Sequence, residues 1–272
     1  MQMDFWLRAK RCGRIGWFPR NIYMQADTGI GGPRSRFPET RPTAIRDLGS
    51  RDSAIRERAL EAVFAAYWKP VYTYIRVRWS QSNEDAKDLT QSFFARALEK
   101  EFLGAYDPEK ARFRTYLRVC LDAFLANESK AAHRLKRGGD AVTISLDFKP
   151  VEQECGRYEV ASNDPSPEDH FRREWVRNLF TLAAEDLKRD CDQHDKRAQF
   201  EIFARYDLSD HAERPTYDGL AAEMGLSTAT VTNQLAAMRR RFRHLLLARI
   251  EEATVSEQEF REEVRAVLGI ET

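Results

Sequence analysis

Residues 85–94 read Asp-Ala-Lys-Asp-Leu-Thr-Gln-Ser-Phe-Phe, and residues 112–118 read Arg-Phe-Arg-Thr-Tyr-Leu-Arg. Both stretches have the three- and four-residue spacing of amphipathic helices. In the first helix, the residues on the apolar side are Ala86, Leu89, Thr90, Phe93, Ala97 and Leu98. The opposite side carries Asp85, Asp88, Ser92, Arg96 and Glu99. The pattern predicts a polar ridge on a buried base, followed one helix later by a basic and aromatic helix.

The sequence around these two helices is also helical in pattern. Apolar residues recur at helical steps on both sides of Pro70, where we expect the helix to break or kink. Ser82 followed by Asp85 predicts a helix start with a reciprocal cap. The basic helix is expected to end near Lys136. Together these segments predict one all-α domain over residues 50–136.

Composition limits the classes of protein to which the chain can belong. With 272 residues, 42% of them hydrophobic, the chain can bury the cores of two small domains. No apolar run approaches the roughly 20 residues of a membrane helix, so no membrane insertion is expected. The four cysteines are far apart and form no metal or redox pair; they are Cys12, Cys120, Cys155 and Cys191. These features favour a reduced, cytoplasmic protein.

Two segments differ from the helical regions in composition. Residues 1–49 are rich in basic residues, Gly and Pro, and we expect a flexible basic arm whose part before Met24 is dispensable. Residues 137–166 contain six acidic and three basic side chains, which predicts a flexible acidic linker. The stretch Ser166-Pro-Glu-Asp then predicts a helix start, and residues 167–272 a second helical domain.

Residues 216–235 have the pattern of a helix-turn-helix. Leu220, Ala221 and Met224 are spaced to face inward, Gly225 permits the tight turn, and Ser227 caps the following helix. Three further inward positions on that helix are Val231, Leu235 and Met238. The residues then expected to face a DNA major groove are Thr228, Ala229, Thr232, Asn233 and Ala236. Arg239, Arg240, Arg241 and Arg243 follow where phosphates would lie.

The order and spacing of these motifs resemble the extracytoplasmic-function group of the sigma-70 family of bacterial RNA polymerase sigma factors. The resemblance covers most of residues 35–268 and includes the pieces Asp88-Leu-Thr-Gln, Phe113-Arg-Thr-Tyr-Leu and the helix-turn-helix. It implies an all-α protein with a sigma region 2 domain and a sigma region 4 domain, joined by the linker. It also implies binding to core polymerase through the β′ clamp helices and the β flap, and binding to promoter DNA.

The resemblance assigns roles to individual residues of the first domain. Asp88 and Gln91 match positions that contact the polymerase clamp, with Ser92 and Phe94 beside them, although Ser92 stands where an acid is usual. The residues that match the DNA-melting region are Arg112, Arg114, Tyr116 and Arg118, with Lys130 and Arg134 extending the basic side. The ring of Tyr116 suits either stacking on an unpaired base or packing in the core. Leu121, Asp122 and Ala126 depart from the family pattern.

In the second domain, the resemblance assigns DNA recognition to the helix that starts near Thr228. Thr230 matches the family pattern, whereas Thr232, Asn233 and Gln234 stand where Lys, Ser and Arg are frequent, so a changed promoter preference is expected. Arg239 and Arg240 would contact phosphates rather than bases.

Two other classes of protein remain as alternatives. A stand-alone helix-turn-helix regulator would explain the second half of the chain and would act as a dimer on a palindrome. An enzyme is disfavoured, because the histidines form no metal-ligand spacing and no phosphate-binding glycine loop is present. No cofactor is implied. The resemblance leaves room for an anti-sigma factor or another regulator as a partner.

Overall fold

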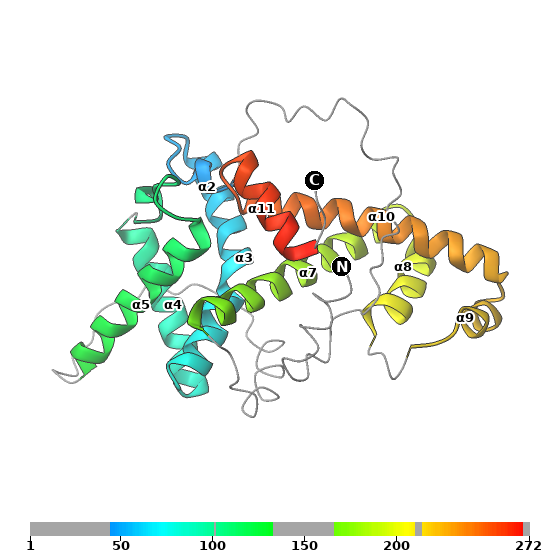
Figure 1. The fold of residues 1–272 in the computed structure, drawn as a ribbon, viewed down its shortest axis with the longest axis horizontal. Coiled ribbons are helices and arrows are strands. Elements are labelled where there is room, and N and C mark those ends of the chain that lie inside the picture. Colours follow the sequence, from blue (N-terminus) through cyan, green and yellow to red (C-terminus); the bar gives the residue numbers. More distant parts are fainter. Residues whose placement is uncertain (1–43, 101, 133–165, 210–213, 269–272) are drawn as a thin grey trace. The chain divides into compact units, whose positions relative to one another are not determined.

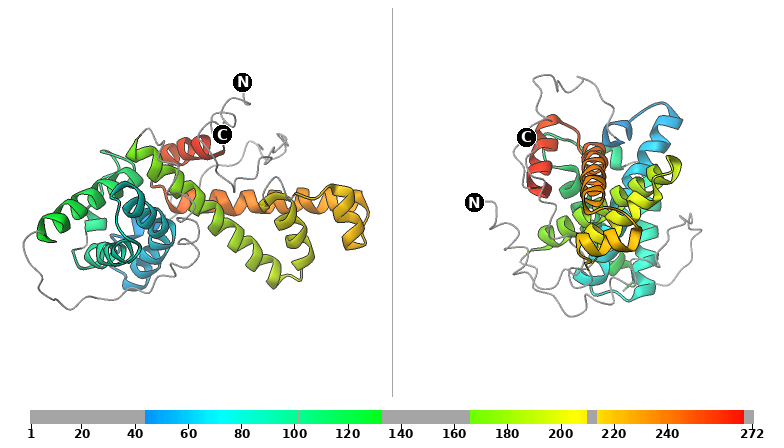
Figure 2. Two further views of the ribbon diagram at one scale, coloured as in Figure 1. Left: turned by 90° about the horizontal axis from the view of Figure 1, so that it is seen from below. Right: turned by 90° about the vertical axis from the view of Figure 1, so that its right-hand side faces the viewer.

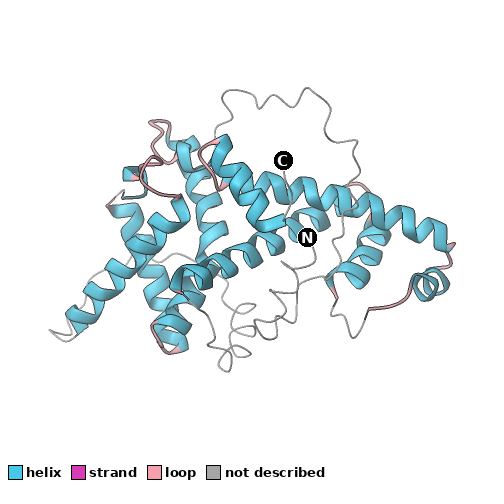
Figure 3. Ribbon diagram, in the orientation of Figure 1, coloured by secondary structure: helices cyan, strands magenta, loops and turns pink. Residues whose placement is uncertain are grey.

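The computed structural model describes residues 44–100, 102–132, 166–209 and 214–268 (Figure 1). Across these ranges all regular structure is helical, and no strand is present (Figure 3). The expected all-α fold class is therefore confirmed for the described part of the chain. The expected acidic linker and almost all of the basic arm lie outside these residues.

The chain divides into two compact units. The larger unit contains residues 42–179 and 250–267, and the smaller unit is built mainly from residues 180–249. This division does not follow the domain boundary expected at residue 167. The reason is that the start of α7 (Pro167–Gln193) and helix α11 (Glu257–Leu268) pack with the first half of the chain.

The larger unit is a group of helices from both ends of the sequence. Besides the first part of α7 and α11, it consists of α2 (Ala44–Asp47), α3 (Ser53–Arg78), α4 (Asn83–Glu99), the 3₁₀ turn η2 (Phe102–Ala105) and α5 (Phe113–Ala132). The helices of residues 44–132, coloured blue to green, stay together in two further views (Figure 2). Helix α3 packs against α2 and α4, and α4 packs against α5.

The arm expected over residues 1–49 is shorter than the sequence suggested. Residues 44–47 form helix α2, and the side chains of Ile45 and Leu48 are buried. Burial of these two apolar side chains holds the segment against α3. The polar and glycine-rich composition of the arm did not indicate this packing.

Short local contacts set the starts of three helices. The Asp52 side chain accepts from the backbone of Ala54 (2.9 Å) at the start of α3. Ser82 and Asp85 form the expected reciprocal cap of α4, since the Asp85 N–H donates to Ser82 Oγ (3.1 Å) and the hydroxyl donates to the Asp85 carboxylate (2.6 Å). The same arrangement between Ser166 and Asp169 starts α7.

Pro70 does not break α3, so of the two expected outcomes, a break or a kink, the break is excluded. Helix α3 runs through this residue, although a proline cannot donate to the carbonyl four residues earlier, here that of Ala66. The side-chain amide of Asn178 on α7 donates instead to the carbonyl oxygens of Ala65 (2.8 Å) and Ala66 (2.9 Å). A tertiary hydrogen bond therefore compensates the backbone bond that the proline removes.

Aromatic rings fill the core of the larger unit. Phe93 and Phe94 of α4 are fully buried, and Phe93 lies 5.6 Å from Phe124 of α5 between ring centroids. Tyr67 of α3 contacts Trp175 of α7 (6.3 Å between centroids) and Phe113 of α5 (5.5 Å). Helix α7 thus contributes directly to the core of the unit that the sequence assigned to residues 50–136.

The smaller unit holds the predicted helix-turn-helix. After the remainder of α7, its elements are α8 (Arg197–Phe203), the π-helical turn η3 (Ala204–Leu208), α9 (Tyr217–Met224) and α10 (Thr228–Glu252), whose last three residues count with the larger unit. Phe242 of α10 lies at the centre of the core and contacts Phe180 (5.8 Å between centroids) and Phe203 (5.5 Å).

The turn between α9 and α10 has the predicted glycine geometry. Gly225 has a φ of 65°, a left-handed conformation that strains other residues, and the N–H of Leu226 donates to the carbonyl of Ala221 (2.9 Å). Ser227 then caps α10 by accepting from the Thr230 N–H (3.1 Å). In the ranges that the structure describes, no helix is both long and apolar enough to cross a membrane.

The role of Asn178 can be tested by a double-mutant cycle with Pro70. We expect Asn178→Ala to lower the free energy of unfolding by about 2 kcal/mol, because it leaves the buried carbonyl of Ala66 without a donor. Pro70→Ala restores an N–H to the Ala66 carbonyl, so Asn178→Ala should cost less in that background. Urea unfolding of the four proteins measures both values. Equal costs of Asn178→Ala in the two backgrounds would contradict the compensation.

Candidate functional site

The polar ridge of α4 is present on the surface of the larger unit. Asp85, Asp88 and Ser92 are exposed and lie at helical spacing, and Gln91 is half-buried beside them. The opposite side of the helix is buried through Ala86, Thr90, Phe93 and Ala97, among others. Three of the four polymerase-contact candidates, Asp88, Gln91 and Ser92, are therefore at least partly accessible to solvent.

Phe94 is the candidate that the structure removes from this surface. Its side chain is fully buried and packs against Phe64 of α3 (4.7 Å between ring centroids) and Phe93 (5.4 Å). The residue anchors α4 in the core because its large apolar ring gains more from burial than from exposure. Phe94 supports the ridge and is not available to contact a partner.

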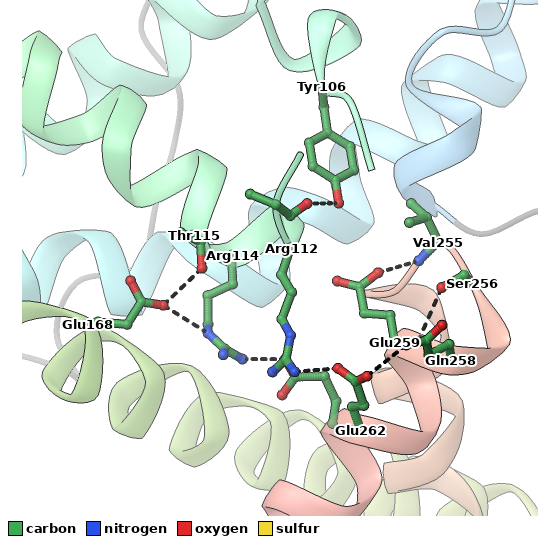
Figure 4. Close-up of polar contacts among 12 residues, drawn as sticks. Tyr106, Arg112, Arg114, Thr115, Glu168, Val255, Ser256, Gln258, Glu259 and Glu262 are labelled. Atoms are coloured by element: carbon green, nitrogen blue, oxygen red, sulfur yellow. Dashed lines mark hydrogen bonds and ion pairs between the residues drawn. The ribbon is translucent and has the colours of Figure 1, made fainter. Parts of the chain in front are cut away.

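The arginines at the start of α5 are held by carboxylates instead of facing solvent freely (Figure 4). Arg114 has 5% of its surface exposed, and its guanidinium donates to Glu263 of α11 (2.9 Å). Arg112 is more accessible and pairs with Glu263 (3.1 Å) and Glu262. Burial opposes the charge of Arg112, but Glu263 and Glu262 outweigh it and raise the pKa of the guanidinium. Both guanidinium groups are therefore occupied by carboxylates of α11.

Arg118 is held by a second carboxylate pair. It donates to Glu168 of α7 (2.7 Å) and to Asp122 one turn along α5 (2.7 Å). Asp122 also accepts from the hydroxyl of Tyr74 (3.0 Å). Here the departure of Asp122 from the family pattern has a structural explanation, since its carboxylate ties α3 to α5 and needs the positive charge of Arg118.

Tyr116 packs within the unit. Its hydroxyl donates to the carbonyl of Phe102 (2.6 Å), and its ring lies 5.4 Å from that of Tyr106 between centroids. Burial, with Cys120 nearby, raises the pKa of Tyr116 to about 12. Of the two roles that the sequence left open, the structure therefore shows the packing role.

Glu259 completes the acidic side of the arginine network. The carboxylate accepts from the backbone N–H of Val255 (2.9 Å), and burial raises the pKa of this carboxyl although that bond and one from the Phe113 backbone lower it. The Phe113 backbone starts α5, so Glu259 also stabilises the helix that carries the arginines. Sequence reasoning did not assign Glu168, Glu262 and Glu263 to these arginines; the acidic spacing along α11 was a signal for Glu262 and Glu263, but not for Glu168 of α7.

The remaining candidate of the first domain within the described residues is Lys130, which is exposed on α5. Arg134, proposed with it, lies outside the described residues. Lys130 is therefore the only melting-region candidate that the structure places on the surface without assigning it a carboxylate partner.

The predicted recognition face of α10 is exposed in the smaller unit. Thr228, Ala229, Thr232 and Asn233 are all exposed, whereas Val231 and Leu235 are buried on the opposite side. Thr230 and Gln234 are half-buried, and the Thr230 hydroxyl lies 2.8 Å from that of Ser227. Four neighbouring residues with small or amide side chains are thus presented together, which suits contacts to base edges.

The arginines that follow on α10 differ in whether they are paired within the fold or exposed to solvent. Arg239 pairs in bidentate geometry with Asp207 of η3 (2.8 and 2.9 Å), and Asp207 has no exposed surface. Burial opposes the charge of Arg239, but Asp207 outweighs it and raises the pKa of the guanidinium. Arg239 is therefore committed to the fold, contrary to its expected role as a phosphate contact. Arg240 is exposed, as that role requires.

Two further arginines of α10 are bound to α7. Arg241 pairs with Asp190 (2.8 Å), and Arg249 pairs with Asp186 (2.8 Å). The aspartates are one turn apart on α7, and the arginines are eight positions apart on α10 in the reverse order. These pairs connect the two helices within the smaller unit and reduce the basic surface that the sequence suggested.

Comparisons with known proteins add no further assignment. No protein-family model, curated protein or solved structure matches the chain.

Arg239 and Arg240 provide a matched pair of variants for stability. We expect Arg239→Ala to lower the free energy of unfolding by about 3 kcal/mol, because it leaves the buried carboxylate of Asp207 without its partner. Arg240→Ala should change it by less than about 0.5 kcal/mol, as is usual for exposed positions. Chemical denaturation followed by circular dichroism measures both changes. Similar stabilities of the two variants would contradict the structural role of Arg239.

Proposed function

We propose that the chain is a sigma factor similar to the extracytoplasmic-function group, which binds core RNA polymerase and directs it to promoters. The observation that carries the proposal is the helix-turn-helix, in which α10 presents Thr228, Thr232 and Asn233 to solvent while its opposite face is buried. The family resemblance supplies the polymerase partner, and the exposed ridge of α4 is compatible with it.

On this proposal, the smaller unit reads the upstream promoter element. The amide of Asn233 can bond the N6 and N7 atoms of an adenine, and the methyl groups of Thr228, Ala229 and Thr232 can contact a thymine methyl. Arg240 contributes attraction to phosphates without reading sequence. Specificity and affinity then depend on different residues of the same helix.

The larger unit would bind the polymerase. Asp85 and Asp88 place negative charge on an exposed helix face, which suits the basic clamp helices that the resemblance implies as the partner. The buried rings beneath, including Phe94, hold the ridge in place, so that little conformational freedom is lost on binding.

One observation favours a second candidate, a stand-alone helix-turn-helix regulator. Arg112, Arg114 and Arg118 are all paired with carboxylates in this structure, so the larger unit offers DNA few free cations among the melting-region candidates. A regulator would read DNA through α10 alone, as a dimer on a palindromic site. Sedimentation of the purified chain, with and without core polymerase, separates the two proposals.

Polymerase binding can be tested on the ridge of α4. We expect the double variant Asp88→Ala and Gln91→Ala to keep its fold but to weaken core binding by about 2 kcal/mol, as truncation of interface hot spots does. Glu57→Ala, at an exposed position of α3 outside the ridge, serves as the control and should bind normally. Titration of labelled core polymerase measures the affinities. A folded double variant that binds core as tightly as the control would refute the polymerase assignment.

Promoter preference can be tested on α10. Asn233→Ala should cost roughly 1–3 kcal/mol at one adenine-containing position and relax the preference there, because the bidentate contact is lost. Arg240→Ala should weaken all sequences alike and flatten the dependence on salt. Selection from a randomised promoter library with the reconstituted holoenzyme at two salt concentrations measures both effects. An unchanged base preference for Asn233→Ala at every position would show that this face does not read DNA.

A further inference from the structure

We propose that helix α11 is an intramolecular competitor of DNA: its carboxylates occupy the arginines of α5, and the larger unit binds nucleic-acid phosphates through these arginines only when α11 leaves them. The proposal rests on the proposed function, since it takes promoter DNA as the ligand. It adds a regulatory contact that the resemblance does not imply.

The contacts that support it come from residues far apart in the sequence. Glu263 accepts from both Arg112 (3.1 Å) and Arg114 (2.9 Å), and Glu262 accepts from Arg112, all within the larger unit (Figure 4). These pairs join positions about 150 residues apart, so they do not result from the local geometry of one helix. Only the placement of α11 brings the carboxylates to α5.

A carboxylate and a phosphate use the same donors of an arginine. The guanidinium fork binds either anion through two parallel N–H groups, so a guanidinium held by Glu262 or Glu263 cannot make the same contact to DNA. Approaching DNA would also repel the acidic side of α11, which carries Glu259, Glu262 and Glu263. Binding of DNA and docking of α11 are therefore mutually exclusive at these arginines.

The docked contact is incomplete, which favours exchange. Glu263 Oε2 and Arg114 Nε are buried, and neither has a hydrogen-bond partner in the described part of the chain, although Arg114 Nε lies 3.9 Å from Glu168 Oε1 in an ion pair. Glu263 therefore binds Arg114 less firmly than it would if every donor and acceptor of the pair were bonded. Removal of Glu263 alone would leave the buried charge of Arg114 without its hydrogen-bonded carboxylate, which is costly, so this carboxylate can be exchanged only for another anion.

The helix itself is short. Helix α11 has 12 residues, a length at which an isolated helix is marginal in water, and Val264 and Val267 are its buried apolar side chains. Without the two carboxylate contacts, α11 would remain attached through these valines and through Glu259, which accepts from the backbone of Phe113. A phosphate that replaces the carboxylates on Arg112 and Arg114 also supplies a new counter-charge, so this exchange costs less than release of the helix alone.

Charge-neutral substitutions in the full chain test the competition. We expect the double variant Glu262→Gln and Glu263→Gln to bind a fluorescein-labelled single-stranded oligonucleotide about tenfold more tightly at low salt, since two cationic contacts become available. Addition of Arg112→Ala to the double variant should remove the gain. Fluorescence anisotropy measures the affinities, and circular dichroism confirms the fold.

A matched control separates the contact from the general effect of charge. Glu262 and Glu257 lie on the same helix with 38% and 44% of their side chains exposed, but Glu262 pairs with Arg112 and Glu257 with Arg261. Glu262→Gln should tighten binding, whereas Glu257→Gln should leave it within about twofold, as expected for an exposed pair on one helix. Equal effects of the two substitutions, or a folded double variant with unchanged affinity, would overturn the proposal.

A second measurement uses the native chain and does not depend on the folding of a variant. Hydrogen–deuterium exchange should show that binding of the same oligonucleotide raises exchange in residues 257–268 while it protects the start of α5. Unchanged or reduced exchange in α11 at saturating DNA would overturn the competition.

The proposal and the proposed function fail in different ways. Normal core binding and promoter-specific transcription by the native chain, without any effect of the Glu262 and Glu263 substitutions, would refute the competition alone. Absence of core binding by the native chain would refute the sigma-factor function, and the anisotropy and exchange experiments would still decide whether α11 competes with DNA.

Discussion

The larger unit depends on the burial of one charged side chain, Arg114. Its guanidinium pairs with Glu263 of α11 and lies 4.9 Å from the centre of the Trp175 ring of α7. A buried guanidinium is costly without a counter-charge, so the unit is electrostatically complete only when segments from both ends of the sequence meet at α5. This requirement explains why the compact unit contains residues 250–267 as well as residues 42–179.

Features that depend on neighbouring residues could be predicted from the sequence. The caps formed by Ser82 with Asp85 and by Ser166 with Asp169, and the left-handed turn at Gly225, involve atoms within a few positions of one another. The positions of Arg112, Arg114 and Arg118 could not be predicted in the same way, because their partners, apart from Asp122 beside Arg118, lie 50 to 151 residues away.

The same reason explains why a run of arginines was an unreliable sign of a nucleic-acid surface. In α10, Arg239 and Arg241 are paired with aspartates from η3 and α7, while Arg240 between them is exposed. A local cluster of positive charge shows only where cations are concentrated. Whether they meet DNA depends on the carboxylates that tertiary structure brings to them, and a formal net charge of +1 leaves many such carboxylates.

The division of labour on α10 has a consequence for how such a protein can evolve. Val231, Leu235 and Arg239 hold the helix to the fold, whereas Thr228, Thr232 and Asn233 contribute little to the core. Substitutions at the latter positions can therefore accumulate with small effects on stability. Gene duplicates of this chain could diverge on that face while they inherit an unchanged scaffold, which makes this exposed face of α10 the part of the molecule most open to innovation.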